Sequence, residues 1–230
     1  MLMKTVVRLL LLSIITVTVL STNFLVLAKQ DDVELTVIEL KRGERGVTVY
    51  ASSTDDSMTN PDYKLLRFHW YSTANYYINS LNDEGLAESG VTAAITTSAA
   101  TWNSATKTST VFSYVGDTTR TAGTRDGYNV VSFGSYSSGV IGVTYIWSIG
   151  KRIIETDTRL NNYFTWSLDE EAGTMDVQNI MTHEFGHWCG LADLYSSSDY
   201  WLTMYGYADY GETYKRTLAT GDITGLNIVY

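Results

Sequence analysis

The stretch HEFGHWCGLAD, from His183 to Asp193, places two histidines four residues apart with Glu184 directly after the first. Residues four apart share one face of an α-helix, so the two imidazoles can converge on one metal ion at the roughly 2.0–2.1 Å that zinc requires. Glu184 lies about 100° further round such a helix, where its carboxylate can take a proton from a metal-activated water without binding the ion. The pattern therefore predicts a zinc-binding helix suited to metal-assisted hydrolysis.

A catalytic zinc needs a third protein ligand, because two histidines alone do not hold it. Gly190 can adopt the left-handed conformation that ends a helix and turns the chain back, which would bring Asp193 toward the ion. Zinc accepts an aspartate oxygen at about 2.0–2.2 Å. The remaining histidine, His69, lies far upstream in LLRFHWYS. We expect Asp193 to be the third ligand and keep His69 as the alternative, since a lone histidine beside Trp70 is more often structural.

The extended motif resembles that of the metzincin metallopeptidases, HExxHxxGxxH, which is followed by a tight turn that holds a methionine beneath the metal. Eleven residues after Asp193, the stretch LTMYGY carries Met204 where such a Met-turn would lie. The closing stretch GETYKRTLATGDITGLNIVY is similar to the C-terminal helix of the matrixin branch, and RFHWYSTANYYIN is similar to its first strand. Asp193 departs from the common pattern, as the corresponding residue does in snapalysin and in some matrixin-like prokaryotic enzymes.

This resemblance implies an α+β catalytic domain over residues 63–230, with a twisted mixed β-sheet, a long zinc-binding helix, a Met-turn and a C-terminal helix. It implies a secreted zinc endopeptidase in which Glu184 is the general base and Met204 shapes the floor of the site without binding the metal. We expect it to be a monomer that acts on a protein or peptide substrate. The ligands implied for its one catalytic zinc are His183, His187 and Asp193.

The pattern along the chain also favours an α+β domain. Short β-branched and aromatic runs between Gly/Asp turns predict strands in ANYYINSL, TVFSYVGD, GYNVVSFG, GVIGVTYIW and KRIIETDTRL. Spacings of three and four predict helices in GVTAAITTSAATWNSAT and ATGDITGLNIVY. DVQNIMTHEFGHWCG predicts a third helix, with Asp176 as N-cap and Gly190 as its stop. GVIGVTYIW is a candidate edge strand that could bind an extended peptide, or else a core strand.

Residues 1–28 have the layout of a secretory signal, with basic residues, an apolar run and Ala28 at a plausible cleavage position. An uncleaved anchor is the alternative, because the run from Val6 to Leu27 is long enough to span a bilayer. Residues 29–62 contain two alternating runs, VELTVIEL and VTVYA, and end in a linker-like stretch. We interpret them as a propeptide or a loosely attached N-terminal extension. We therefore expect an extracellular protein, with no membrane partner unless the anchor is retained.

The net charge of -9 disfavours a nucleic-acid partner. Cys189 is the only cysteine, so an intrachain disulfide is excluded. Cys189 lies two residues past His187 and points to the opposite side of the helix, which predicts a buried thiol and no cysteine switch.

Matrixins bind calcium in loops comparable to those that hold Asp117, Asp126 and Asp157. The absence of EF-hand spacing leaves calcium and ordinary solvated carboxylates as alternatives there.

Two other functions are alternatives, a gluzincin zinc hydrolase and a non-catalytic binding domain. A gluzincin zinc hydrolase takes its third ligand from a glutamate about twenty residues downstream. Tyr207 stands at that position and the nearest acids are Asp209 and Glu212, which disfavours this class. A non-catalytic, zinc-stabilised binding domain could keep the helix as a scaffold, but such a domain has no need of Glu184, which is present.

Overall fold

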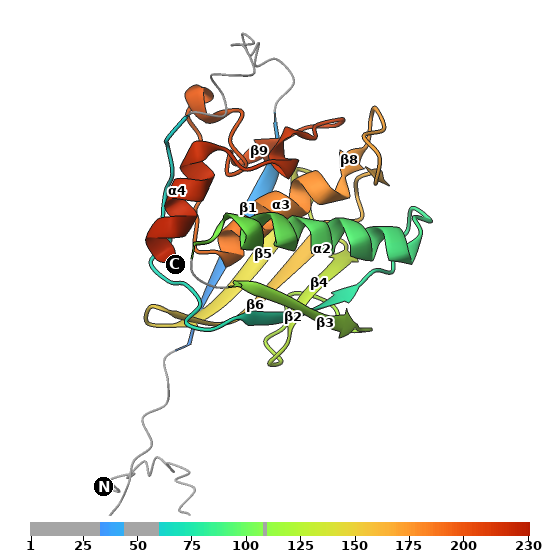
Figure 1. Cartoon of the computed structure of the whole chain (residues 1–230). Helices are drawn as coiled ribbons and strands as arrows, with labels where there is room; N and C mark the ends of the chain where they lie inside the picture. Colours follow the sequence, from blue (N-terminus) through green and yellow to red (C-terminus); the bar gives the residue numbers. More distant parts are fainter. Residues whose placement is uncertain (1–32, 44–59, 108–109) are drawn as a thin grey trace, which may run out of the picture. The chain divides into compact units, whose positions relative to one another are not determined.

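The computed structural model of the protein describes residues 33–43, 60–107 and 110–230. Within these ranges the chain forms a seven-stranded mixed sheet with the order β3-β2-β4-β6-β5-β1-β9. The strands are β1 (Glu34–Arg42), β2 (Ala74–Asn79), β3 (Phe112–Asp117), β4 (Asn129–Gly134), β5 (Val140–Ile149), β6 (Arg152–Asn161) and β9 (Tyr207–Ala208). A second, two-stranded sheet pairs β7 (Trp166–Ser167) with β8 (Met175–Asp176). Figure 1 shows the main sheet as a twisted layer.

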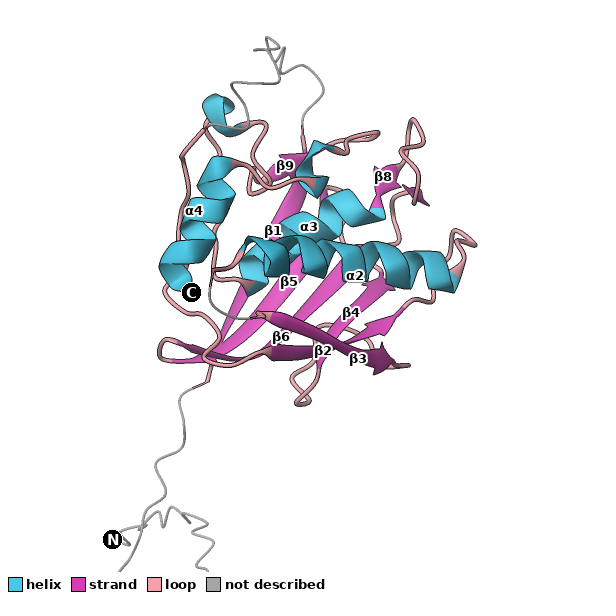
Figure 2. Cartoon of the chain, in the orientation of Figure 1, coloured by secondary structure: helices cyan, strands magenta, loops and turns pink. Residues whose placement is uncertain are grey.

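The helices are α2 (Glu88–Ala105), α3 (Val177–Trp188) and α4 (Thr220–Val229), with short 3-10 turns at Ser197–Asp199 and Tyr214–Arg216. Helices α2 and α3 lie over the same face of the sheet (Figure 2). The indole nitrogen of Trp102 in α2 donates a hydrogen bond to the Thr182 carbonyl of α3 at 2.7 Å, which fixes one helix against the other. The predicted α+β fold with a mixed sheet and a C-terminal helix is confirmed.

Strands β3, β2, β4 and β6 run parallel to one another, and β5 runs antiparallel to β6. Both β5 and β6 are almost continuously buried, as strands covered on two faces should be. The face of α2 predicted to be apolar is buried as expected, through Val91, Ile95, Ala99 and Trp102. Helix α3, which carries the predicted metal ligands, packs on strand β5 of this central pair.

Part of the presumed N-terminal extension belongs to the main sheet. We interpreted residues 29–62 as a propeptide or a loosely attached extension, but Glu34–Arg42 pairs antiparallel with β5 and briefly parallel with β9. Loose attachment is therefore wrong for this segment, and the propeptide interpretation stays a prediction. Of the two alternatives for GVIGVTYIW, the core strand is confirmed and the free edge is wrong, because β1 pairs with the side of β5 that faces away from β6.

The alternation of β1 explains why it joins the sheet. Ile38 and Leu40 point to the same face and pack into the hydrophobic core, and Leu40 is fully buried. Leu35 and Val37 point the other way and are exposed. A strand with one apolar face gains free energy only when that face is covered, at roughly 25 cal/mol for each Å² of apolar surface buried. The hydrophobic core cluster, in which Leu40 lies, supplies the cover.

Several N-terminal predictions fall outside the described residues. These are the signal peptide or anchor at residues 1–28, the alternating run VTVYA and most of the linker before Tyr63. Among the residues that the structure does describe, no helix has the length and apolar character needed to cross a bilayer.

The end of helix α3 gives a first testable consequence. Gly190 and Gly85 have positive φ angles of 92° and 73°. An alanine at either position incurs backbone strain of about 1 kcal/mol. A Cβ on Gly190 would also lie 2.9 Å from the Phe68 carbonyl oxygen, whereas nothing lies within 4 Å of one on Gly85. We expect Gly190→Ala to lower the free energy of unfolding by about 2–3 kcal/mol and Gly85→Ala by about 1 kcal/mol. Urea denaturation measures both, and equal losses would contradict a tight turn at Gly190.

Candidate metal centre

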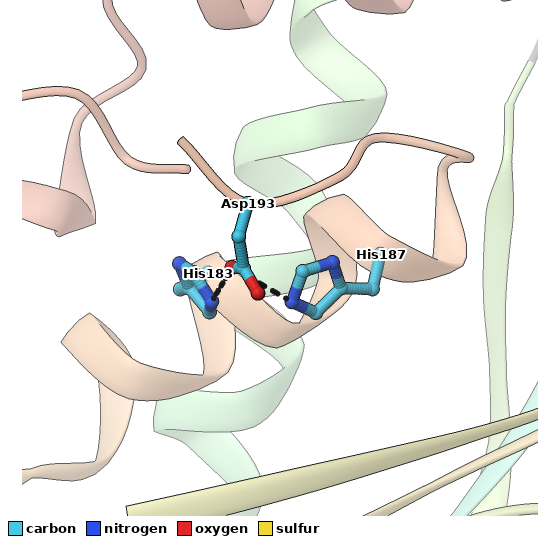
Figure 3. Close-up of side chains that lie close together, drawn as sticks. All are labelled: His183, His187 and Asp193. Atoms are coloured by element: carbon cyan, nitrogen blue, oxygen red, sulfur yellow. Dashed lines mark ion pairs between the residues drawn. The ribbon is translucent and has the colours of Figure 1, made fainter. Parts of the chain in front are cut away.

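The structure brings together the three residues that the sequence predicted as metal ligands. One potential ligand atom from each of His183, His187 and Asp193 lies within 4.8 Å of the other two. Asp193 Oδ1 is 3.2 Å from Nε2 of His183 and 3.4 Å from Nε2 of His187 (Figure 3). All three side chains are buried. In Figure 3 the aspartate carboxylate lies between the two imidazole rings.

Local sequence positions this group. The Asp176 side chain accepts a hydrogen bond from the Asn179 backbone N–H at 2.7 Å and so caps the start of α3, as predicted. At the other end, Gly190 takes the left-handed conformation and the Leu191 N–H returns to the Gly186 carbonyl at 3.0 Å. This reversal places Asp193 opposite the helix turn that carries the histidines.

Backbone carbonyls fix the orientation of both imidazole rings. Nδ1 of His183 lies 2.7 Å from the Thr203 carbonyl oxygen, and Nδ1 of His187 lies 2.9 Å from the Leu191 carbonyl oxygen. A carbonyl oxygen can only accept, so Nδ1 carries the hydrogen in each ring. In the neutral imidazole Nε2 is then left with a lone pair that faces the cluster, which is the tautomer that binds a metal.

A cation fits the pattern of unsatisfied atoms at this centre. Buried polar atoms without a hydrogen-bond partner are costly and rare. Four such atoms gather here, and they are Nε2 of His183, Nε2 of His187, Oδ1 of Asp193 and Oε1 of Glu184. Two imidazoles and one carboxylate make up a donor set that zinc accepts, with a fourth tetrahedral position left for water or substrate.

Asp193 is held as an anion with one oxygen directed at the histidines. The Tyr195 hydroxyl donates a hydrogen bond to Oδ2 at 3.0 Å, so Oδ1 faces the cluster. Burial would raise the pKa of Asp193, but the neighbouring His187 and His183 outweigh burial and lower this pKa to about 2. The carboxylate is therefore charged near neutral pH, as a metal ligand must be.

A chain of hydroxyl groups holds Glu184 from the sheet side. Oε2 of Glu184 accepts a hydrogen bond from the Thr144 hydroxyl at 2.6 Å, and Thr144 lies 2.6 Å from the Thr158 hydroxyl. The indole nitrogen of Trp188, which can only donate, donates to Thr158 at 2.9 Å. The direction of donation is therefore set from Trp188 through the two threonines to Glu184.

The other oxygen of Glu184 is left free. Burial raises the pKa of Glu184 to about 7, although His187 and the hydrogen bond from Thr144 act to lower it. A Cβ placed on Gly142 of β5 would lie 2.3 Å from Oε1 of Glu184. The glycine thus leaves the space that the free oxygen occupies.

Met204 packs against α3 in the turn where the Met-turn was predicted. It is buried, and a Cβ placed on Gly186 would lie 2.1 Å from its sulfur, so the thioether packs against α3 between the two histidines. The buried Asp222 carboxylate of α4 accepts hydrogen bonds from the backbone N–H groups of Thr203 and Met204 at 3.1 and 3.3 Å. Helix α4 therefore supports the turn that also orients His183.

His69 is not part of this group. Its backbone N–H donates a hydrogen bond to the Lys151 carbonyl at 3.0 Å, and its ring lies edge-on to Tyr71 with 4.7 Å between the ring centroids. The acids that a gluzincin would need also lie elsewhere. Asp209 faces Arg42 at 3.7 Å, and Glu212 pairs with Lys215, so neither belongs to the histidine group.

The remaining sequence candidates have other partners. Cys189 is buried, and burial raises the pKa of its thiol, in agreement with the prediction of an inert side chain. The calcium candidates each bind hydrogen-bond donors, since Asp117 accepts from a tyrosine, Asp126 pairs with an arginine and Asp157 accepts from two backbone N–H groups. Within the described ranges, the one cluster of three or more His, Cys, Asp or Glu side chains with metal-binding geometry is the group built on α3.

The residues that hydrogen-bond to the ligands and to Glu184, or that support those partners, were not predicted from the sequence. Tyr195 stands two positions after Asp193 and could have been found from that proximity. The others act through backbone carbonyls or through hydroxyl groups on distant strands, for which the sequence gives no local signal. The supporting residues are Thr144, Thr158, Trp188, Leu191, Tyr195, Thr203 and Asp222.

The fold and the site together define a metallopeptidase domain. A family model described as Matrixin matches residues 69–230. The chain therefore belongs to the matrixin family of zinc metallopeptidases, which confirms the resemblance found in the motif. No curated protein matches the chain.

Proposed function

We propose that this protein is a secreted zinc endopeptidase that hydrolyses peptide bonds in proteins or peptides. His183, His187 and Asp193 would hold the ion. The observation that carries the proposal is the convergence of buried, unpartnered donor atoms from these three residues beside the unpartnered oxygen of Glu184. Secretion rests on the signal-like layout of residues 1–28.

A zinc ion bound there supplies a Lewis acid for the scissile carbonyl and lowers the pKa of a water molecule. The protein contributes the proton transfers. Oε1 of Glu184 takes a proton from the attacking water and delivers it to the nitrogen of the leaving amine. Thr144 holds Oε2, so Oε1 keeps its direction during both steps. A pKa of about 7 suits a group that must accept and then release a proton near neutral pH.

A non-catalytic binding domain is the alternative class. Such a domain would need the ligands but not a carboxylate anchored by three hydrogen-bonded side chains behind it. Among the described residues Glu184 forms no ion pair with a lysine or arginine that would give it a structural role, and its free oxygen is the kind of buried group that proteins retain for chemistry. These features favour the enzyme.

The experiment that tests this proposal measures whether proteolysis depends on the bound metal. The full chain, loaded with zinc, should produce internal cuts in casein during a long incubation, as read by mass spectrometry. 1,10-Phenanthroline should stop the cutting and added zinc should restore it, while His187→Ala should be inactive throughout. Cuts that persist under chelation would contradict the proposal. So would the absence of cuts by the zinc-loaded chain.

A further inference from the structure

A buried ion pair lies in the segment that follows the Met-turn. The ammonium nitrogen of Lys215 is 2.5 Å from Oε1 of Glu212. Lys215 has 0% of its surface exposed, and it is the one lysine or arginine among the described residues that is buried. Taking two charges out of water is costly, so a pair of this kind is weak evidence for stability. Its contacts suggest a different role.

Asn179 of helix α3 joins this pair to the metal-binding helix. Nδ2 of Asn179 donates a hydrogen bond to Oε1 of Glu212 at 3.1 Å, and Oδ1 accepts one from the backbone N–H of Lys215 at 2.8 Å. Asn179 is fully buried and lies four residues before His183, which places both side chains on one face of α3. The helix face that carries His183 is therefore attached to the ion pair.

The carbonyl group that orients His183 belongs to the same network. The Thr203 carbonyl oxygen lies 2.7 Å from Nδ1 of His183. The Thr203 hydroxyl lies 3.2 Å from the Thr217 carbonyl oxygen and 3.4 Å from that of Lys215, so its single hydrogen is shared between these two acceptors. From His183 the contacts thus return through Thr203 to Lys215, which closes a ring of hydrogen bonds around one turn of α3.

The two charges of the ion pair hold the backbone at one corner of this ring. Nζ of Lys215 also donates to the Tyr214 hydroxyl at 3.2 Å and lies 4.4 Å from the centroid of the Tyr214 ring. Oε2 of Glu212 accepts a hydrogen bond from the Asp209 backbone N–H at 3.2 Å. Loss of either charge would leave its partner buried and unpaired, which favours a shifted segment that brings the remaining charge to water.

The second histidine is oriented from a different part of the chain. Nδ1 of His187 lies 2.9 Å from the Leu191 carbonyl oxygen, just past the end of α3. The adjoining Gly190 carbonyl accepts a hydrogen bond from the Leu66 N–H at 2.7 Å, so this turn is held by the segment before β2. A change in the ion pair should therefore affect His183 and spare His187.

We propose that Lys215, paired with Glu212, is a positioning residue for the metal centre. The pair fixes the backbone of Lys215, which contacts both Asn179 and Thr203. These two residues in turn set the position and ring orientation of His183, so that its Nε2 faces the other ligands. This inference rests on the proposed function for the identity of the ion as zinc.

The first measurement is the zinc affinity of full chains, determined by competition with a chromophoric chelator. Lys215→Met removes the ammonium group and keeps a long, unbranched side chain. We expect zinc affinity to fall about 10- to 100-fold, the range typical of residues that support metal ligands. The matched control is Ile78→Ala in β2, a strand that β4 and β6 separate from β5. It removes fully buried side-chain atoms and lowers stability, but it should leave zinc affinity unchanged.

A double substitution separates positioning from stability. Glu212→Gln/Lys215→Met contains neither charge, so it should resist urea better than Lys215→Met alone. If the pair only stabilised the fold, zinc affinity would recover together with stability. We expect the zinc affinity of the double variant to stay about 10- to 100-fold below that of the unsubstituted chain, because the Lys215 backbone has lost its anchor.

NMR of the zinc-loaded chains reports on each histidine separately. Nε2 would bind the ion, so Nδ1 keeps its hydrogen in every variant, and its hydrogen bond to a carbonyl slows exchange with solvent. In Lys215→Met the Nδ1 hydrogen of His183 should exchange at least about tenfold faster, while that of His187 should be unchanged. Unchanged exchange at His183, or equal acceleration at both histidines, would contradict the role of the ring.

The outcomes separate this inference from the proposed function. The inference would be overturned by folded Lys215 variants that bind zinc as tightly as the unsubstituted chain, by full recovery in the double variant, or by an equal loss in Ile78→Ala. If Lys215→Met does not fold, the double variant carries the test. Failure of both to fold would overturn the inference, because the pair would then be required for folding. Zinc binding without peptide cleavage would contradict the peptidase alone, whereas an unsubstituted chain that binds no zinc would contradict both.

Discussion

Replacing Glu184 by Ala should remove nearly all peptide hydrolysis and leave zinc bound. A positioned general base contributes about 10²–10⁴-fold to the rate, and this carboxylate is the only unpartnered acid next to the ligand group among the described residues. The metal is expected to stay, because Glu184 is not one of the three converging ligands. Turnover of a fluorogenic peptide and zinc content by mass spectrometry of the metal are the two measurements.

The matched control is Glu171→Ala, which removes an exposed glutamate from a loop and should change neither quantity. Both substitutions are compared with the unsubstituted chain under the same zinc loading. Hydrolysis at the unsubstituted rate in Glu184→Ala would contradict its role as base. Loss of zinc in that variant would show instead that Glu184 is a ligand.

Much of the centre could be predicted because it is local in sequence. His183, His187 and Asp193 lie within eleven residues, and two simple rules connect them, the helical repeat and the left-handed glycine that reverses the chain. The N-cap at Asp176 could be predicted from the local sequence in the same way. The central strands could also be predicted from the sequence, because their β-branched runs are bounded by turns.

The parts that escaped prediction depend on contacts between distant segments. Thr144 and Glu184 are forty residues apart, and only the packing of α3 on β5 brings them together. The alternation of residues 33–40 was visible as a strand signal, but nothing in it names β5 as the partner. We therefore assigned the segment to an extension, whereas the buried Leu40 ties it to the centre of the domain. Its removal during maturation stays a prediction.

Replacing Asp193 by Ala should sharply weaken zinc binding. The change leaves two histidine ligands, removes the negative charge that lies 3.2 and 3.4 Å from their Nε2 atoms, and frees the Tyr195 hydroxyl. Loss of a direct ligand should cost more than the roughly 10–100-fold in affinity typical of residues that only support ligands. Asp193→His should retain zinc, because it restores the commoner three-histidine set of the metzincins.

The most direct test of the account is the zinc content of these chains after dialysis against a weak chelator. We predict about one zinc ion per chain for the unsubstituted protein, for Asp193→His and for His69→Ala, and little or none for Asp193→Ala. Circular dichroism would establish that each chain is folded. If Asp193→Ala holds zinc as tightly as the unsubstituted chain, or if His69→Ala loses it, the centre formed by His183, His187 and Asp193 is not the zinc site.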